Sequence, residues 1–87
     1  MQELTTLIHN EIGLHARPAA LLVKTAKQFK STVTITYKGK TVNAKSLVLL
    51  LGLGVAKQAE VTLTTEGEDE QEAIHALNAL IERKFAE

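Results

Sequence analysis

The residues best suited to chemistry lie together in one short stretch, Gly13-Leu14-His15-Ala16-Arg17-Pro18. A neutral imidazole is a good nucleophile near pH 7, and an Arg guanidinium offers a rigid fork of donors that suits phosphate oxygens. We therefore interpret His15 as a candidate phosphoryl acceptor, with Arg17 and the backbone of Ala16 as its phosphate-binding partners. A surface residue or a weak helix cap is the alternative, because a single His before a helix often has no other role.

A helix that starts at this stretch would supply the rest of an anion site. Pro18 suits the first turn of a helix, where its missing N–H is not needed. The first N–H groups of a helix have no internal partners, and the helix dipole is positive at that end, so anions bind there. Gly13 allows the preceding loop an unusual backbone angle or a close approach. Apolar residues then recur at helical spacing to a predicted end near Phe29, at Ala19, Leu22, Val23 and Ala26.

Alternating apolar and polar residues predict four strands, which would form the sheet that supports this helix. Residues 10–14 are a predicted loop, and Lys38-Gly39 is a predicted turn between two strands. The order β-α-β-β-α-β-α favours an α+β fold, with a four-stranded antiparallel sheet covered on one face by helices. We expect Thr and Lys side chains on the other face, toward water. The predicted strands are 4–8, 32–37, 40–43 and 60–65.

Capping signals predict two further helices. Ser46 can cap a short helix over 47–51, which Gly52 or Gly54 would end. The residues of this helix are all apolar and cannot all face inward, so we expect an exposed apolar patch that could bind a partner. A helix buried entirely in a tight core is the alternative. Asp69, followed three residues later by Glu, resembles a capping box before the apolar stripe of a last helix, Ala73, Ile74, Leu77, Leu80 and Ile81.

Length and composition limit the protein to one domain and a few classes of function. The 87 residues suit a single domain, 1–87, and the absence of Cys excludes disulfides and thiol chemistry. Net charge is zero, but residues 1–57 hold eight Lys and Arg against two Glu, and residues 58–87 hold two against eight acidic residues. The basic part favours an acidic partner surface, with a merely solvated surface as the alternative. Nucleic acid is not expected, because Arg-rich clusters are absent and aromatic residues are few.

Membrane insertion, metal ions and cofactors are not expected either. The longest run without a polar residue, 47–56, is far shorter than a membrane span, and the first residues do not resemble a signal peptide, so we predict a cytoplasmic protein. His9 and His75 lack the spacing of metal ligands and are interpreted as bystanders. The sequence has no P-loop and no Gly-rich nucleotide motif.

Several motifs resemble one known family. Gly-Leu-His-Ala-Arg-Pro-Ala-Ala at 13–20 resembles the active-site signature of HPr, the histidine-containing phosphocarriers of the bacterial phosphoenolpyruvate-dependent sugar phosphotransferase system. Lys-Ser-Leu at 45–47, with Leu-Gly-Leu-Gly at 51–54, is similar to the second helix of that family and its regulatory serine. Tyr-Lys-Gly-Lys at 37–40 and Glu-Gly-Glu-Asp-Glu at 66–70 match its turns. The resemblance covers essentially the whole chain.

The resemblance implies an open-faced β-sandwich and a carrier that other enzymes use as a substrate. Enzyme I would phosphorylate His15 at Nδ1 with a phosphoryl group from phosphoenolpyruvate, and enzyme IIA domains would receive it. Ser46 would be a regulatory phosphorylation site for an HPr kinase, and a transcriptional regulator would be a further partner. Because the family binds partners through its first two helices, the resemblance also implies a contact surface of Ala20, Lys24, Lys27, Lys45, Leu47, Val48 and Leu51.

Further expectations concern the oligomeric state, the branch of the phosphotransferase system and the regulation. We expect a monomer. A paralogue in a regulatory or nitrogen-related phosphorelay is one rival, and a small α+β domain that binds RNA or a metabolite without phosphoryl transfer is another. Val48 and Leu51 stand where Gram-positive members of the family commonly have Met, and enteric members are more polar at 49 and 51. Regulation through Ser46 and the exact set of partners therefore stay open.

Overall fold

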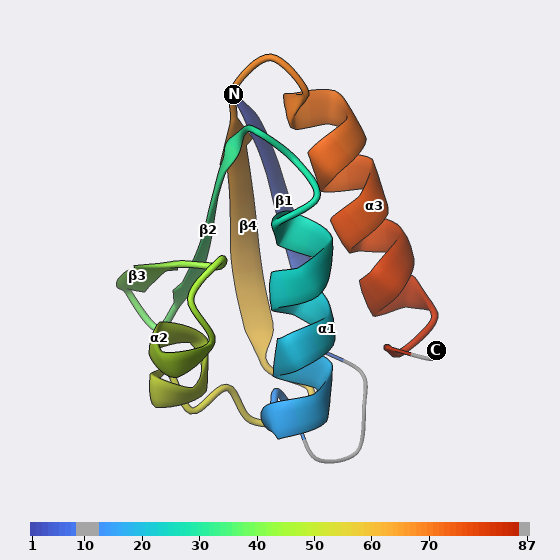
Figure 1. Cartoon of the computed structure of the whole chain (residues 1–87). Coiled ribbons are helices and arrows are strands. Elements are labelled where there is room, and N and C mark those ends of the chain that lie inside the picture. Colours follow the sequence, from blue (N-terminus) through green and yellow to red (C-terminus); the bar gives the residue numbers. More distant parts are fainter. Residues whose placement is uncertain (9–12, 86–87) are drawn as a thin grey trace.

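One antiparallel sheet and three helices make up the described chain, residues 1–8 and 13–85 of a computed structural model (Figure 1). The predicted order of elements is confirmed, and so is the α+β class. Several boundaries differ from the prediction. The first strand both begins and ends earlier than predicted, the first helix ends before Phe29, and the short helix and the last strand each end one residue later than predicted. His9 and the part of the predicted loop up to residue 12 lie outside the described residues. The elements are β1 (Gln2–Leu7), α1 (Ala16–Ala26), β2 (Thr32–Tyr37), β3 (Lys40–Asn43), α2 (Leu47–Gly52), β4 (Glu60–Glu66) and α3 (Glu70–Glu82).

The sheet has the strand order β1-β4-β2-β3, and all neighbouring strands are antiparallel. Figure 1 shows α1 and α3 lying side by side over one face, with α2 beside β3 and the first turns of α1. The core lies between this face and the two long helices, because alternate residues of the central strands are buried against them. Its members include Val33, Ile35, Val61 and Leu63 of the sheet and Leu22, Leu77 and Leu80 of the helices.

The open face of the sheet is covered by threonines, as the alternation predicts. Thr5, Thr62, Thr36 and Thr41 are paired across all four strands and form a single row. Their hydroxyl groups hydrogen-bond in pairs, at 2.9 Å between β1 and β4 and at 2.7 Å between β2 and β3. The expectation of lysines on this face is wrong. Lys40 is the lysine within these strands, and it pairs with Tyr37, which belongs to the face that packs against the core.

The predicted capping box at the start of α3 is also wrong. Asp69 is the N-cap residue, but its side chain makes no hydrogen bond to its own helix. Its carboxylate instead accepts hydrogen bonds from the Ser31 hydroxyl and from the N–H groups of Lys30 and Ser31, the latter two at 2.9 Å. These bonds, the Ser31 hydroxyl first, hold the pKa of Asp69 below its ordinary value. Asp69 therefore joins the turn before α3 to the loop that follows α1.

Candidate functional site

His15 lies at the N-cap position of α1, with its side chain exposed. Its backbone is extended, with φ −80° and ψ −174°, and its carbonyl accepts the hydrogen bond of the Ala19 N–H at 2.9 Å. The His15 side chain makes no cap hydrogen bond to the helix. The residue thus begins the helix through its backbone, and its imidazole is left available for chemistry.

The segment before His15 is fixed by backbone contacts with the segment that leads into β4. The Leu14 N–H donates to the carbonyl of Val55 at 3.0 Å, and the Leu14 side chain is buried in the core. Gly13 has a φ of +74°, and a Cβ at this position would lie only 2.5 Å from the Val55 oxygen. Both reasons given for Gly13 from the sequence, an unusual angle and a close approach, are confirmed.

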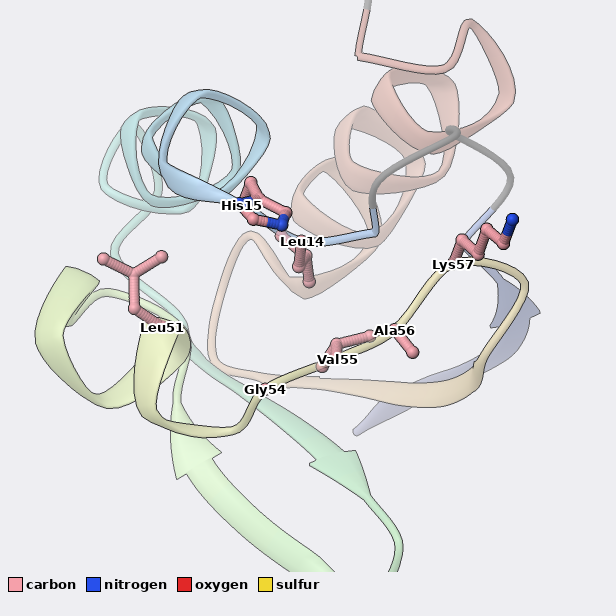
Figure 2. Close-up of a pocket in the computed structure, with 7 residues that line it drawn as sticks. All are labelled: Leu14, His15, Leu51, Gly54, Val55, Ala56 and Lys57. Carbon is pink, nitrogen blue, oxygen red and sulfur yellow. The ribbon is translucent and has the colours of Figure 1, made fainter.

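A hollow of about 500 Å³ adjoins His15, as Figure 2 shows. The start of α1, the end of α2 and the segment 54–57 meet around it. In Figure 2 the imidazole lies at one edge of the hollow, and the Lys57 side chain points away from it. The sequence analysis identified His15 here but missed the opposite side, because a contact between residues about 40 positions apart leaves no local signal. The lining residues are Leu14, His15, Leu51, Gly54, Val55, Ala56 and Lys57.

Arg17 lies in the first turn of α1, two residues beyond His15, and is exposed. Ala16, also exposed, is the first helical residue. Pro18 falls in the same turn, as predicted, where its lack of an N–H costs no intrahelical hydrogen bond. The start of this helix therefore brings together an imidazole, a guanidinium and the positive end of the helix dipole. An oxyanion attached to His15 would find backbone and side-chain donors within one turn.

The short helix α2 starts at Ser46, whose hydroxyl accepts a hydrogen bond from the Leu49 N–H at 3.3 Å. The prediction of Ser46 as a cap is confirmed. Leu50 is buried, but Val48 is 80% exposed and the remaining leucines of the helix are between 39% and 48% exposed. The predicted apolar patch therefore exists, and the fully buried alternative is wrong. We call the exposed side chains of Leu47, Val48, Leu49 and Leu51 the α2 patch.

The predicted contact residues outside α2 differ in how they are placed. Ala20, Lys24 and Lys27 are exposed on α1 or at its C-cap. Lys45 is half-buried, and its Nζ donates a hydrogen bond to the carbonyl oxygen of Phe29 at 2.8 Å. The structure therefore sets Lys45 apart from the two lysines of α1.

The described acidic residues and histidines form no candidate metal site. Over residues 1–8 and 13–85, no group of three or more His, Asp and Glu side chains is arranged to hold a metal ion. His75 is exposed on α3, away from the apolar stripe, as predicted. In the same part of the chain, no helix is both long and apolar enough to cross a membrane.

An exposed imidazole at the start of a helix, beside an arginine and a hollow, is typical of a histidine phosphocarrier. A family model described as the phosphorylation site of the PTS HPr component matches residues 2–83. The chain belongs to the HPr family, whose members are phosphocarriers of the phosphotransferase system that serves sugar transport. The resemblance given from the sequence is confirmed.

Solved structures agree with this membership. HPr-C-His from Thermoanaerobacter tengcongensis is 52% identical, with a TM-score of 0.96 over 100% of this chain and 98% of that one. HPr from Bacillus anthracis is 40% identical, with a TM-score of 0.87 over 92% and 95% of the two chains. Crh, a catabolite repression protein of Bacillus subtilis solved as an intertwined dimer with a swapping domain, is 42% identical, with a TM-score of 0.77 over 100% of both chains.

Proposed function

We propose that this protein accepts a phosphoryl group on His15 from phospho-enzyme I and donates it to enzyme IIA domains for sugar uptake. The observation that supports this most directly is the exposed imidazole at the N-cap of α1, which makes no hydrogen bond to its own helix. Membership of the HPr family supports the phosphocarrier class. Such a carrier acts in the cytoplasm, together with its donor and acceptors, and acts there as a monomer.

The transfer step needs a neutral imidazole whose Nδ1 has a free lone pair, with the ring proton on Nε2. The Nδ1–phosphorus bond forms as the bond between phosphorus and the donor group of enzyme I breaks, and the electron pair of that bond stays with the donor. Arg17 and the N–H groups at the start of α1 stabilise the phosphoryl oxygens during and after transfer. Onward transfer to enzyme IIA reverses these roles, because His15 is then the leaving group.

Docking uses the surface around His15, formed by α1 and the α2 patch. Ala20, Lys24 and Lys27 lie on one side of this surface, and Leu47, Val48 and Leu51 lie on the other. Exposed apolar side chains next to lysines fit a partner with an apolar centre and an acidic rim. The hollow beside His15 gives a partner side chain room to approach the imidazole.

Ser46 is the proposed regulatory phosphorylation site, with an HPr kinase or a transcriptional regulator as a further partner. Its hydroxyl already lies at the positive end of α2, so a phosphate there is compatible with the fold. A dianion beside the α2 patch would repel an acidic partner and place a charge next to an apolar contact. Its main effect would therefore fall on docking and not on folding.

Reconstitution of the relay tests the proposal. Purified protein, enzyme I and phosphoenolpyruvate are mixed, and sugar-specific or regulatory enzyme IIA domains are added to separate samples. We expect phosphate to pass to the sugar-specific domains and to require this protein. Transfer only to the regulatory domain would indicate the paralogous branch instead. Failure to accept phosphate from enzyme I at all would contradict the proposal.

A further inference from the structure

Lys45 directly precedes the N-cap residue of α2, and its side chain is bound within the molecule, at the end of α1 that lies away from His15. Its Nζ donates a 2.8 Å hydrogen bond to the Phe29 carbonyl, three residues beyond the end of α1. Lys45 is half-buried, whereas Lys24 and Lys27 are exposed. A cation near the C-terminal end of a helix also meets the negative end of its dipole. The Lys45 ammonium is therefore directed at the end of α1 and not outward to a partner.

The backbone around Lys45 fixes the start of α2 at the same time. The Lys45 N–H donates to the Asn43 side-chain oxygen at 2.8 Å, and the Ser46 N–H donates to the Asn43 carbonyl at 3.2 Å. Ser46 then begins α2 as its N-cap. One residue thus joins the start of α2, through its backbone, to the end of α1, through its side chain.

α2 also packs directly against α1 and β3. It contains six residues, and Leu50 is its buried side chain. At its C-terminal end, the chain returns to the core through Val55, which accepts the Leu14 hydrogen bond. A helix this short gains little from its own hydrogen bonds and depends on tertiary contacts. Loss of one of them would let the α2 patch shift relative to α1.

We propose that Lys45 is a positioning residue, whose hydrogen bond to the Phe29 carbonyl holds α2 against α1 so that both helices form one docking surface. The inference rests on the proposed function, which assigns docking to these two helices. Lys24 and Lys27 attract an acidic partner over a distance through their exposed charges. Lys45 instead acts through the geometry of the surface, so its removal weakens docking without changing how docking responds to salt.

Three variants separate positioning from steering. Lys45→Met keeps an unbranched stem and removes the ammonium, Lys45→Arg keeps a donor, and Lys24→Met removes an exposed charge as the matched control. Initial rates of phosphorylation by enzyme I are measured against protein concentration at several ionic strengths. We expect Lys45→Met to raise the apparent KM by roughly tenfold or more, the change that corresponds to the loss of one hydrogen bond from a charged donor, with kcat and the salt slope unchanged. Lys24→Met should flatten the salt slope, and Lys45→Arg should restore the KM.

Amide hydrogen exchange gives a second readout that needs no enzyme I. Lys45→Met should speed exchange at residues 28–30 and 49–51, and Lys24→Met should not. The proposal is overturned if Lys45→Met flattens the salt slope as much as Lys24→Met does, or if it leaves both the KM and the exchange rates unchanged. If the wild-type protein accepts no phosphate from enzyme I, the proposed function is wrong, and so is the proposed docking surface. The amide exchange rates still show in that case whether Lys45 joins the two helices.

Discussion

His15 and Arg17 are the residues whose chemistry could be foreseen from their types, and their spacing places both in one helical turn. His15 begins α1 with its backbone, and Arg17 follows in the first turn. A phosphoryl group on the imidazole adds negative charge at this point, which the helix dipole and a guanidinium both favour. The residues across the hollow, 54–57, could not be foreseen, because the contacts of Gly13 and Leu14 with Val55 join parts of the chain that are far apart in the sequence.

Replacing Arg17 with Lys should slow transfer although the charge is kept. Lys offers a compact ammonium in place of a planar fork of donors. The loss of one charge-assisted hydrogen bond, about 1.5–3 kcal/mol, corresponds to a rate lower by about tenfold or more. Stopped-flow measurement with phospho-enzyme I and with enzyme IIA checks both directions, and Arg83→Lys at the end of α3 is the control. Equal rates for Arg17→Lys and wild type would remove Arg17 from the mechanism.

The helices and strands could be predicted largely from periodicity and turn chemistry. Threonine alternates with apolar residues in β2 and β4, and Ser46 begins α2 as expected. The prediction of a capping box is wrong because the Asp69 carboxylate accepts hydrogen bonds from the loop after α1 instead of from its own helix. No local sequence pattern indicates these donors. When a side chain can hydrogen-bond either to its own helix or to a distant loop, its partner depends on the tertiary fold.

Gly13→Ala should be strongly destabilising. The left-handed angle costs about 1–2 kcal/mol for a residue with a Cβ, and the contact with the Val55 oxygen adds about 1–3 kcal/mol. Gly39→Ala is the matched control, because its φ of +81° is similar but a Cβ there meets nothing within 4 Å. Urea unfolding of both variants should show the larger loss for Gly13→Ala. Equal losses would mean that the close approach to Val55 does not constrain the chain.

The stabilising contribution of Asp69 should be lost in acid. Because the folded-state pKa of Asp69 lies below its ordinary value of 3.8, its contribution is present at neutral pH and is lost as pH falls through the folded pKa. The stability difference between wild type and Asp69→Asn should therefore shrink below about pH 4. Urea midpoints measured from neutral to acid pH test this, with Glu68→Gln as the control, since Glu68 forms only an exposed pair with Lys30. A difference that stays constant with pH would contradict the assigned hydrogen bonds.

At the scale of the whole molecule, the fold places the apolar α2 patch beside the helix that begins at His15. The sheet order β1-β4-β2-β3 brings β1 and β4 together from opposite ends of the sequence. Periodicity predicts strands but not which of them pair, so this order and the hollow beside His15 could not be derived from local patterns. The charge difference between residues 1–57 and 58–87 is visible in the sequence, but how these charges are placed relative to His15 is a property of the fold.

Neutralising a lysine near the docking surface should slow association with enzyme I more than neutralising one elsewhere. We compare Lys24→Gln on α1 with Lys30→Gln, which lies beyond the end of α1 and pairs with Glu68 at 3.3 Å. Steering by charge falls off within a Debye length, about 8 Å at physiological salt. Association rates at several ionic strengths should therefore show a flatter salt dependence for Lys24→Gln. Equal slopes for the two variants would place the docking surface elsewhere.

The phosphorylated residue is the central point of the account, and a single labelling experiment addresses it. Wild type, His15→Ala and His75→Ala are incubated with enzyme I and phosphoenolpyruvate, and bound phosphate is measured before and after mild acid. Phosphohistidine is lost in acid, and His75 is a second exposed histidine, on α3. The account predicts acid-labile phosphate on wild type and His75→Ala and none on His15→Ala. Acid-labile phosphate on a folded His15→Ala protein would contradict it.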